Sequence, residues 1–241
     1  MLTPDEKKRL IGSFTVATLY KEGALHNGMR LGLGTGTTIA HVISSLAVLI
    51  SEGKLKDIYI VPTSEGSLAR CEAFNIPTYS LNSSYVLGHL DLAIDGADRI
   101  DANKNMIKGG GAALFREKVV AYNADAFAVV LSADKKVENL NCNFPIPIEV
   151  LPFAYKSVLE ALKKREIEGC VREGSGKIGP TITDNGNYIL DLKYPLNLKI
   201  DAKKEEDTLN KLVGVIENGI FTNTNNTRVF MIEDSGDITS Y

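Results

Sequence analysis

Side chains that could transfer protons are concentrated in one short segment of the chain. Residues 92–118 read LAIDGADRIDANKNMIKGGGAALFREK. An apolar stretch is followed there by two aspartates, a lysine, three consecutive glycines and a glutamate. Asp95 and Asp98 come directly after the apolar stretch, and catalytic groups collect at the carboxyl edge of a parallel sheet, where such strands end. We therefore interpret this segment as the chemical centre of the chain.

Glu117 is the strongest candidate for a catalytic base. If a helix begins near Ala112, Glu117 lies in the middle of an apolar stripe on that helix. The other members of the stripe are Ala113, Leu114, Val120, Ala121 and Ala124. Burial without a cationic partner raises the pKa of a carboxyl group, which suits a base that must return its proton. The alternative is a structural ion pair with Arg116, Lys118 or a more distant lysine.

A lysine and three glycines precede this helix. Lys108, Gly109, Gly110 and Gly111 could direct an ammonium group and free backbone N–H groups toward developing negative charge. The alternative is a flexible hinge with a solvated lysine. The neighbouring aspartates and Glu117 favour the chemical interpretation, because a hinge does not need them.

A second glycine-rich segment favours a phosphate site. Residues 32–38 read GLGTGTT between a short apolar strand and an apolar helical stretch. Thr37 replaces the third glycine of a dinucleotide fingerprint, and the next predicted strand ends without an acidic residue for a ribose hydroxyl, so a nicotinamide cofactor is disfavoured. Backbone N–H groups and three hydroxyls at a helix amino terminus suit one phosphate monoester. The alternative is a tight turn that merely needs glycine.

Composition describes an ordinary globular protein that can bury a full core. Hydrophobic residues make up 44% of the 241 residues, and the net charge of −3 comes without a basic cluster, which argues against nucleic acid and against a polybasic membrane patch. The longest apolar run, residues 46–50, is too short to span a bilayer, and the first residues carry no apolar signal core. We expect a cytoplasmic protein with neither a nucleic-acid nor a membrane partner.

Scattered cysteines and histidines argue against a metal centre. The three cysteines and the three histidines are widely separated in the chain, so neither a disulfide framework, a zinc site nor a histidine-based triad is indicated. We predict no metal and expect carboxylates to carry the acid-base chemistry.

The elements that position these residues alternate between strand and helix. A capping box over residues 3–6 predicts a first helix, whose apolar face includes Leu10, Ile11, Phe14 and Ala17. Predicted strands cover residues 29–33, 58–61, 78–81, 91–94 and 127–131, and predicted helices cover residues 39–50, 67–74 and 112–123. This alternation predicts an α/β fold with a right-handed parallel βαβ sheet.

The pattern changes near residue 139. Residues 139–147 are too rich in proline and asparagine for a regular element and indicate a crossing between domains. Helices are then predicted at residues 158–164 and 201–212, and strands at residues 169–172, 181–183, 188–192, 213–216 and 228–232. We predict a catalytic domain of residues 1–138 plus about 213–241, and a smaller α+β domain of about residues 139–212.

Taken together, these motifs resemble the type A ribose-5-phosphate isomerases. The likeness rests on GLGTGTT, DGADRID, KGGGAALFREK and TDNGN in that order and spacing, and it covers essentially the whole chain. The resemblance implies a Rossmann-like domain with a smaller ferredoxin-like domain, assembled as a homodimer or homotetramer. It also implies that D-ribose 5-phosphate and D-ribulose 5-phosphate are interconverted through an enediolate, without metal or organic cofactor.

The resemblance assigns a role to each matching position. Glu117 becomes the base that moves a proton between C2 and C1, Asp95 assists ring opening and Lys108 stabilises developing charge. Asp95 and Asp98 become ligands of sugar hydroxyls. The implied substrate-binding residues are Lys8, Thr35, Gly36, Thr37, Thr38, Asp95, Gly96, Ala97, Asp98, Lys108, Gly109, Gly110, Gly111 and Lys135.

The sequence departs from the family pattern at Arg99, and it leaves two alternative functions open. Arg99 stands where the family usually has an acidic residue, which puts substrate preference in question. The first alternative function is that of a relative in fold, a coenzyme A transferase or a sugar-phosphate deaminase. The second is a sugar-phosphate-binding regulatory domain, which would need neither Glu117 nor Lys108, and no basic helix-turn-helix is present for such a role.

Overall fold

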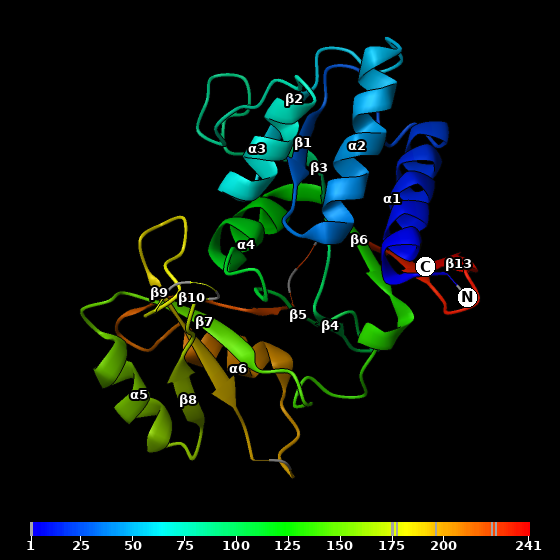
Figure 1. Cartoon of the computed structure of the whole chain (residues 1–241). Helices are drawn as coiled ribbons and strands as arrows, with labels where there is room; N and C mark the ends of the chain where they lie inside the picture. Colours follow the sequence, from blue (N-terminus) through cyan, green and yellow to red (C-terminus); the bar gives the residue numbers. More distant parts are fainter. Residues whose placement is uncertain (1, 175, 177, 196, 223, 225) are drawn as a thin grey trace. The chain divides into compact units, whose positions relative to one another are not determined.

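Two compact units make up the chain. The structure is a computed structural model that describes residues 2–174, 176, 178–195, 197–222, 224 and 226–241 (Figure 1). The first unit comprises Met1–Gly96, Arg116–Lys135 and Asn223–Tyr241, and the second comprises Ala97–Phe115 and Lys136–Thr222. The chain therefore passes from the first unit into the second and back twice.

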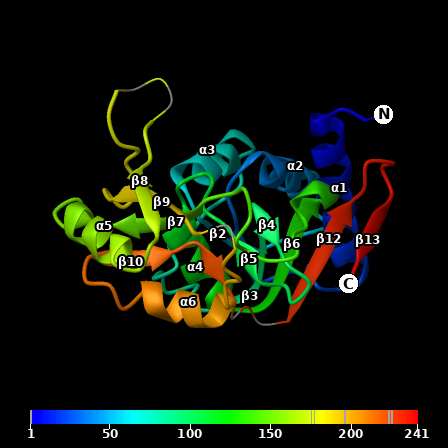
Figure 2. The same ribbon diagram turned by 90° about the horizontal axis from the view of Figure 1, so that it is seen from below.

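A mostly parallel sheet forms the centre of the first unit. Its strands follow the order β13-β12-β6-β3-β1-β2, and all neighbours are parallel except β12 and β13. Figure 2 shows β12 and β13 side by side in red at one edge. The strands are β1 (Arg30–Leu33), β2 (Tyr59–Pro62), β3 (Leu90–Asp95), β6 (Ala124–Ser132), β12 (Thr227–Ile232) and β13 (Ile238–Ser240). The predicted α/β class and parallel sheet are confirmed.

Register brings the two sequence motifs of this unit together. Leu33 pairs with Ile94, so the glycine segment after β1 and the carboxylate that ends β3 leave the sheet side by side at its carboxyl edge. Asp95 itself pairs with Val129 of β6. This edge is where an open parallel sheet collects its ligand-binding groups.

Helices surround this sheet. They are α1 (Pro4–Lys21), α2 (Thr37–Ser51), α3 (Glu65–Ala73) and α4 (Leu114–Tyr122), and a 3₁₀ turn, Ala133–Lys135, follows β6. The predicted capping box of α1 is confirmed, because the Thr3 hydroxyl accepts from the Glu6 N–H while the Glu6 carboxylate accepts from the Thr3 N–H at 2.7 Å. Helices α1 and α2 pack against each other (Figure 1), and their buried side chains join those of β1 in one hydrophobic core.

The second unit holds an antiparallel sheet with two helices. Its strands follow the order β10-β7-β9-β8, and along the chain they appear as β7-α5-β8-β9-α6-β10. This βαββαβ connection is the ferredoxin-like arrangement that the resemblance implied. The elements are β7 (Ile146–Val150), α5 (Tyr155–Lys163), β8 (Glu168–Val171), β9 (Tyr188–Lys193), α6 (Ala202–Leu209) and β10 (Val215–Asn218). A separate three-stranded sheet contains β4 (Arg99–Ile100), β5 (Met106–Ile107) and β11 (Ile220–Phe221).

The compact units differ from the predicted domains mainly in two segments, and the second unit resumes at Lys136 rather than near residue 139. Residues 213–222 belong to the second unit, because β10 pairs antiparallel with β7 and supplies the fourth strand of the βαββαβ motif. Residues 97–115 also belong there, because β5 pairs with β11. Neither pairing leaves a periodic signal in such short strands.

Some predicted elements are shorter than expected or absent. Residues 78–81 form only one bridge, between Thr78 and Ile60, and residues 181–183 form only the bridge between Ile182 and Tyr188. The crossing segment at residues 139–147 runs into β7, which contains Pro147. None of the helices in the described part of the chain combines the length and the apolar character that crossing a bilayer requires.

Candidate active site

A cavity of about 400 Å³ in the first unit contains four of the predicted substrate-binding residues. They are Lys8, Thr37, Thr38 and Lys135, which come from the first helix, the start of α2 and the 3₁₀ turn after β6. Lys135 lies about a hundred positions or more from the other three in the sequence. The structure therefore brings together two ammonium groups and two hydroxyls that only the resemblance had linked.

The amino terminus of α2 supplies backbone donors to this cavity. Gly36 is its N-cap residue, with a φ of 113°, and no side chain caps the helix there. The first N–H groups of a helix have no acceptor within it, and they carry the positive end of its dipole. Thr37 and Thr38 begin the helix and line the cavity. These groups, with two lysines, are suited to a phosphate dianion.

Two adjacent lysines on α1 have different partners. Lys7 donates to Asp234 at 2.5 Å, and this hydrogen bond, together with the lysine charge, lowers the pKa of that aspartate. Lys8 also lines the cavity, and no ion pair joins it to a carboxylate in the part of the chain that the structure describes. The structure therefore favours Lys8 over Lys7 as the residue that contacts an anion.

Asp95 holds the glycine turn that precedes α2. Its Oδ1 atom accepts from the Thr35 N–H at 3.2 Å and from the Gly96 N–H at 2.7 Å, and its side chain is only 3% exposed. A Cβ atom on Gly34 would lie 1.8 Å from the same Oδ1 atom. Glycine is therefore required at this position so that the Asp95 carboxylate can reach the turn.

Four hydroxyl groups, those of Thr35, Thr63, Ser64 and Ser67, also support the turn, and only Thr35 was expected from the sequence to belong to the site. The Thr35 hydroxyl contacts those of Thr63 at 2.8 Å and Ser64 at 2.7 Å, and Ser64 contacts Ser67 at 2.9 Å. The Ser67 hydroxyl then donates to the Gly34 carbonyl at 2.6 Å. A signal was present, because hydroxyl residues directly follow β2, and β2 ends beside β1.

Glu117 is buried in the first turn of α4. Its exposed fraction is 4%, and the apolar residues predicted to share its stripe are buried as well. The inward placement is thus confirmed, although the helix begins at Leu114 rather than near Ala112. The Arg116 guanidinium donates to Glu65 at 3.0 Å, and the Lys118 ammonium lies 5.6 Å from the Tyr122 ring centre. A carboxyl group that is shielded from water is suited to carry a proton between two carbon atoms without losing it to solvent.

Lys108 is buried in the second unit. Its exposed fraction is 3%, its ammonium lies 5.5 Å from the centre of the Phe221 ring, and its N–H donates to the Gly219 carbonyl at 2.9 Å. A solvated lysine on a flexible hinge, which was the structural alternative, is therefore wrong. A buried ammonium is an effective stabiliser of negative charge, because little water screens it.

Asp98 holds the second glycine turn in the same unit. Its Oδ2 atom accepts from the Gly110 N–H at 2.7 Å. The turn closes with a hydrogen bond from the Ala112 N–H to the Gly109 carbonyl at 3.0 Å, and Ala112 has a φ of 60°. Positive φ is unfavourable for alanine, and such strain collects at functional sites.

Arg99 and Asp101 have structural partners. The Arg99 guanidinium lies 4.7 Å from the centre of the Phe144 ring and donates to the Asp98 carbonyl. Asp101 accepts from the N–H groups of Asn103 and Asn105. Arg99 therefore packs against an aromatic ring and binds a backbone carbonyl.

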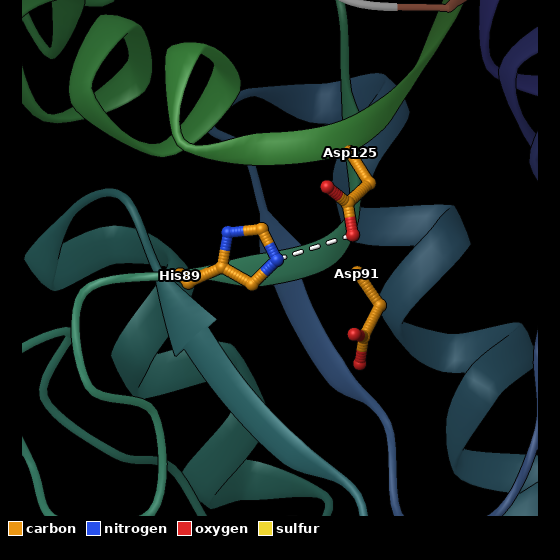
Figure 3. A group of neighbouring side chains, drawn as sticks. All are labelled: His89, Asp91 and Asp125. Carbon is orange, nitrogen blue, oxygen red and sulfur yellow. Dashed lines mark hydrogen bonds and ion pairs between the residues drawn. The ribbon is translucent and has the colours of Figure 1, made fainter.

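One further polar cluster lies at the opposite edge of the first sheet. His89, Asp91 and Asp125 stand where β3 and β6 begin, with one ligand atom of each within 4.8 Å of the others (Figure 3). His89 Nε2 lies 3.1 Å from Asp125 Oδ2, and Asp91 accepts from the Arg30 N–H at 2.6 Å. These contacts explain the cluster as a structural one at a solvent-exposed edge.

Comparison with known proteins assigns the chain to a family. Residues 59–236 match the model of ribose 5-phosphate isomerase A (phosphoriboisomerase A). The chain is 48% identical over 231 residues to ribose-5-phosphate isomerase A of Treponema denticola, covering 96% of each, and 42% identical to that of Treponema pallidum, covering 96% of the chain and 91% of the relative. The chain belongs to the ribose 5-phosphate isomerase A family.

Solved structures agree with this assignment across the whole length. A D-ribose-5-phosphate isomerase in complex with phospho-erythronic acid superposes with a TM-score of 0.89 at 36% identity, covering 100% of this chain and 99% of the other. The isomerase of Methanocaldococcus jannaschii gives 0.87 at 35% identity, with 99% of both chains covered. The chain is thus an isomerase, and neither a transferase, a deaminase nor a regulatory domain is favoured.

Proposed function

We propose that the chain interconverts D-ribose 5-phosphate and D-ribulose 5-phosphate, with Glu117 as the base that carries a proton between C2 and C1. The observation that supports this role most strongly is a glutamate that is 4% exposed on a short helix directly after the Lys108–Gly111 turn. An aldose and its ketose differ by the position of one hydrogen next to a carbonyl group, so a single carboxylate can remove the proton and return it.

The phosphate of the open-chain sugar binds in the cavity at the start of α2. Lys8 and Lys135 supply positive charge there, and the N–H groups of the first helical turn supply directed donors. A phosphate held at one end of the sugar places the carbonyl end at a fixed distance from it. Binding energy from a non-reacting group is then used to orient the reacting carbons.

Negative charge that develops on the enediolate oxygen is stabilised by Lys108 and by backbone N–H groups of the glycine turn. Lys108 is suited to this because its ammonium is buried beside an aromatic ring. Removing one donor of this kind typically costs about 10²-fold or more in rate. Asp95, which ends β3 at the same sheet edge as the Gly34–Gly36 turn, assists opening of the sugar ring.

A direct assay tests the activity. The purified chain is incubated with D-ribose 5-phosphate in the presence of a metal chelator, and formation of the ketose is followed by absorbance. Ketose should form at the same rate with and without chelator, since carboxylate chemistry needs no metal. Absence of ketose in both conditions contradicts the proposed activity, and loss only with chelator contradicts the metal-free mechanism.

Assembly into a homodimer or homotetramer forms part of the proposal. Phe153 and Val213 are 103% and 93% exposed, and Leu151 beside them is 45% exposed. A subunit contact would bury such an apolar surface. Light scattering on the purified chain should give a mass above that of one chain, and Phe153→Ser should lower it. A monomer at all concentrations contradicts this part. A cytoplasmic location stays a prediction.

A further inference from the structure

We propose that Arg172 is a positioning residue of the isomerase, which holds the Gly109–Gly111 turn in the conformation that leaves the Gly111 N–H available to the developing negative charge. The inference rests on the proposed function, because it gives this turn its chemical role. Neither the sequence motifs nor the residue roles implied by the family resemblance include Arg172. Its place just after β8 is about sixty residues from the turn that it contacts.

The contacts of Arg172 with the turn involve two successive carbonyl groups. One guanidinium nitrogen, Nη1, donates to the Gly109 carbonyl at 2.8 Å and to the Gly110 carbonyl at 3.1 Å. A cavity of about 480 Å³ is lined by Arg172 together with Gly110, Gly111 and Ala112, so the guanidinium stands at the same opening as the turn.

The guanidinium is itself fixed from its other edge. Nε and Nη2 of Arg172 donate to the two carboxylate oxygens of Asp191 at 2.8 and 2.5 Å. The exposed fractions of the two side chains are 17% and 16%, so water screens the pair only in part. A planar guanidinium can grip a carboxylate with one edge and carbonyl oxygens with the third nitrogen, whereas a lysine cannot do both.

Peptide geometry converts these carbonyl contacts into an orientation of N–H groups. In a trans peptide the N–H points opposite to the carbonyl of the preceding residue. Carbonyls of Gly109 and Gly110 that are drawn toward Arg172 therefore turn the N–H groups of Gly110 and Gly111 away from it. The first of these reaches Asp98 at 2.7 Å. Among the described residues, the N–H of Gly111 has no acceptor, so it is available to a substrate oxygen.

The turn needs outside support because its own conformation is unfavourable. Gly109 has a φ of 104° and Ala112 has a φ of 60°. One hydrogen bond closes the turn, and consecutive glycines lose much backbone entropy when they are ordered. Arg172 and Asp98 hold the two sides of the peptide group between Gly109 and Gly110, which restricts it to one orientation.

The test measures kcat and KM for D-ribose 5-phosphate separately in two variants, Arg172→Gln and Arg172→Lys. We expect kcat to fall about 10²-fold in the glutamine variant, with KM changed by less than about threefold, because a misdirected N–H fails mainly in the transition state. The lysine variant should lose nearly as much, since an ammonium cannot bridge Asp191 and both carbonyls. Asp191→Asn, which keeps the arginine, should lose less.

Arg165 provides a matched control in the same unit. Its Nη2 atom donates to both oxygens of Glu205 at 2.8 and 2.7 Å, so Arg165 also forms an arginine–carboxylate pair, but no hydrogen bond joins it to either glycine carbonyl within the described residues. Arg165→Gln removes an equivalent ion pair and should leave kcat within about twofold of the wild type. Comparable loss of kcat in both glutamine variants would show a general structural effect and overturn the inference.

Chemical rescue distinguishes positioning from folding. In Arg172→Ala, guanidinium ions at concentrations far below those that unfold proteins should restore part of kcat, while sodium ions at equal ionic strength should not. Wild-type kcat in a folded Arg172→Gln variant, or equal effects of both cations, overturns the inference and leaves the proposed function intact. A wild-type chain that forms no ketose instead overturns the proposed function itself.

Discussion

Two glycine turns, residues 34–38 and residues 108–111, are held by the same kinds of contact, but different side chains make those contacts. In each turn an aspartate accepts a backbone N–H: Asp95 accepts from Thr35, and Asp98 accepts from Gly110. In each, a distant side chain also donates to a glycine carbonyl. The donor is the Ser67 hydroxyl for the first turn and a guanidinium for the second.

The difference matches the task that we propose for each turn. The first turn precedes a 15-residue helix, and the N–H groups of that helix provide the positive potential for a phosphate, so neutral hydroxyls suffice as support. The second turn precedes a short helix and must stabilise charge that exists only during the reaction. Its supports, Lys108 and Arg172, are therefore charged and held in place by partners.

The largest effect is expected from Gly34→Ala. The new Cβ atom would lie 1.8 Å from an oxygen of Asp95, which is buried and has little room to move. The carboxylate must leave the turn, so we expect kcat/KM to fall by about 10³-fold and the free energy of unfolding to fall by roughly 1–3 kcal/mol. Steady-state kinetics and chemical denaturation measure both. Activity near that of the wild type would show that this close approach is unimportant.

Gly110→Ala should have a smaller effect on the second turn. Its Cβ atom would lie 2.7 Å from an oxygen of Asp98, which is half-buried and able to shift. We expect kcat to fall about tenfold with little change in the free energy of unfolding, because the carboxylate can rotate away from the N–H it accepts. If Gly110→Ala lowered kcat/KM more than Gly34→Ala does, the second turn would be the less tolerant of the two, contrary to this prediction.

Ser67→Ala tests the hydroxyl support of the first turn. The Gly34 carbonyl loses its 2.6 Å hydrogen bond, and Ser64 loses a neighbour, so the free energy of unfolding should fall by about 1–2 kcal/mol. Because this turn is proposed to hold the phosphate, KM should rise more than kcat falls. A variant that lowers kcat alone would assign the first turn to charge stabilisation instead. Ser51→Ala, which alters an exposed hydroxyl that caps no turn of the site, is the control.

Labelling of the Cys71 thiol gives a further test of the hydroxyl support around Ser67, and its expected effect is the smallest. Burial raises the pKa of its thiol to about 11, so the thiolate fraction at pH 8 is about a hundredfold below that of an ordinary cysteine. Mass spectrometry after labelling at pH 8 should find Cys170, which is exposed, modified long before Cys71. Labelling of Cys71 should accelerate in Ser67→Ala, because both residues lie on α3. Equal labelling of the two cysteines in the wild type would contradict the burial of the Cys71 thiol.

Local signals accounted for the parts of the site that the sequence could reveal. The capping box of α1, the strand that ends in Asp95 and the apolar stripe around Glu117 involve residues within one or two helical turns of each other. Periodicity and capping depend on such short separations, which is why those predictions agree with the structure.

Interactions over long sequence separations could not be predicted in the same way. Arg172 reaches Gly109 across 63 positions, and Ser67 reaches Gly34 across 33. Nothing near these residues in the chain indicates which carbonyl they will contact. The fourth strand of the second sheet, β10, could not be placed for a similar reason, since only its pairing with β7 determines the sheet to which it belongs.

Glu117→Gln tests the central chemical role most directly. The amide keeps the size of the side chain but cannot accept a proton from carbon, so turnover of D-ribose 5-phosphate should fall by about 10³-fold or more. The KM for D-ribose 5-phosphate should stay within about tenfold, because the substitution leaves the proposed phosphate contacts in place. Glu65→Gln, the same change at the exposed partner of Arg116, should leave both unchanged. Retained turnover in Glu117→Gln would exclude Glu117 as the base.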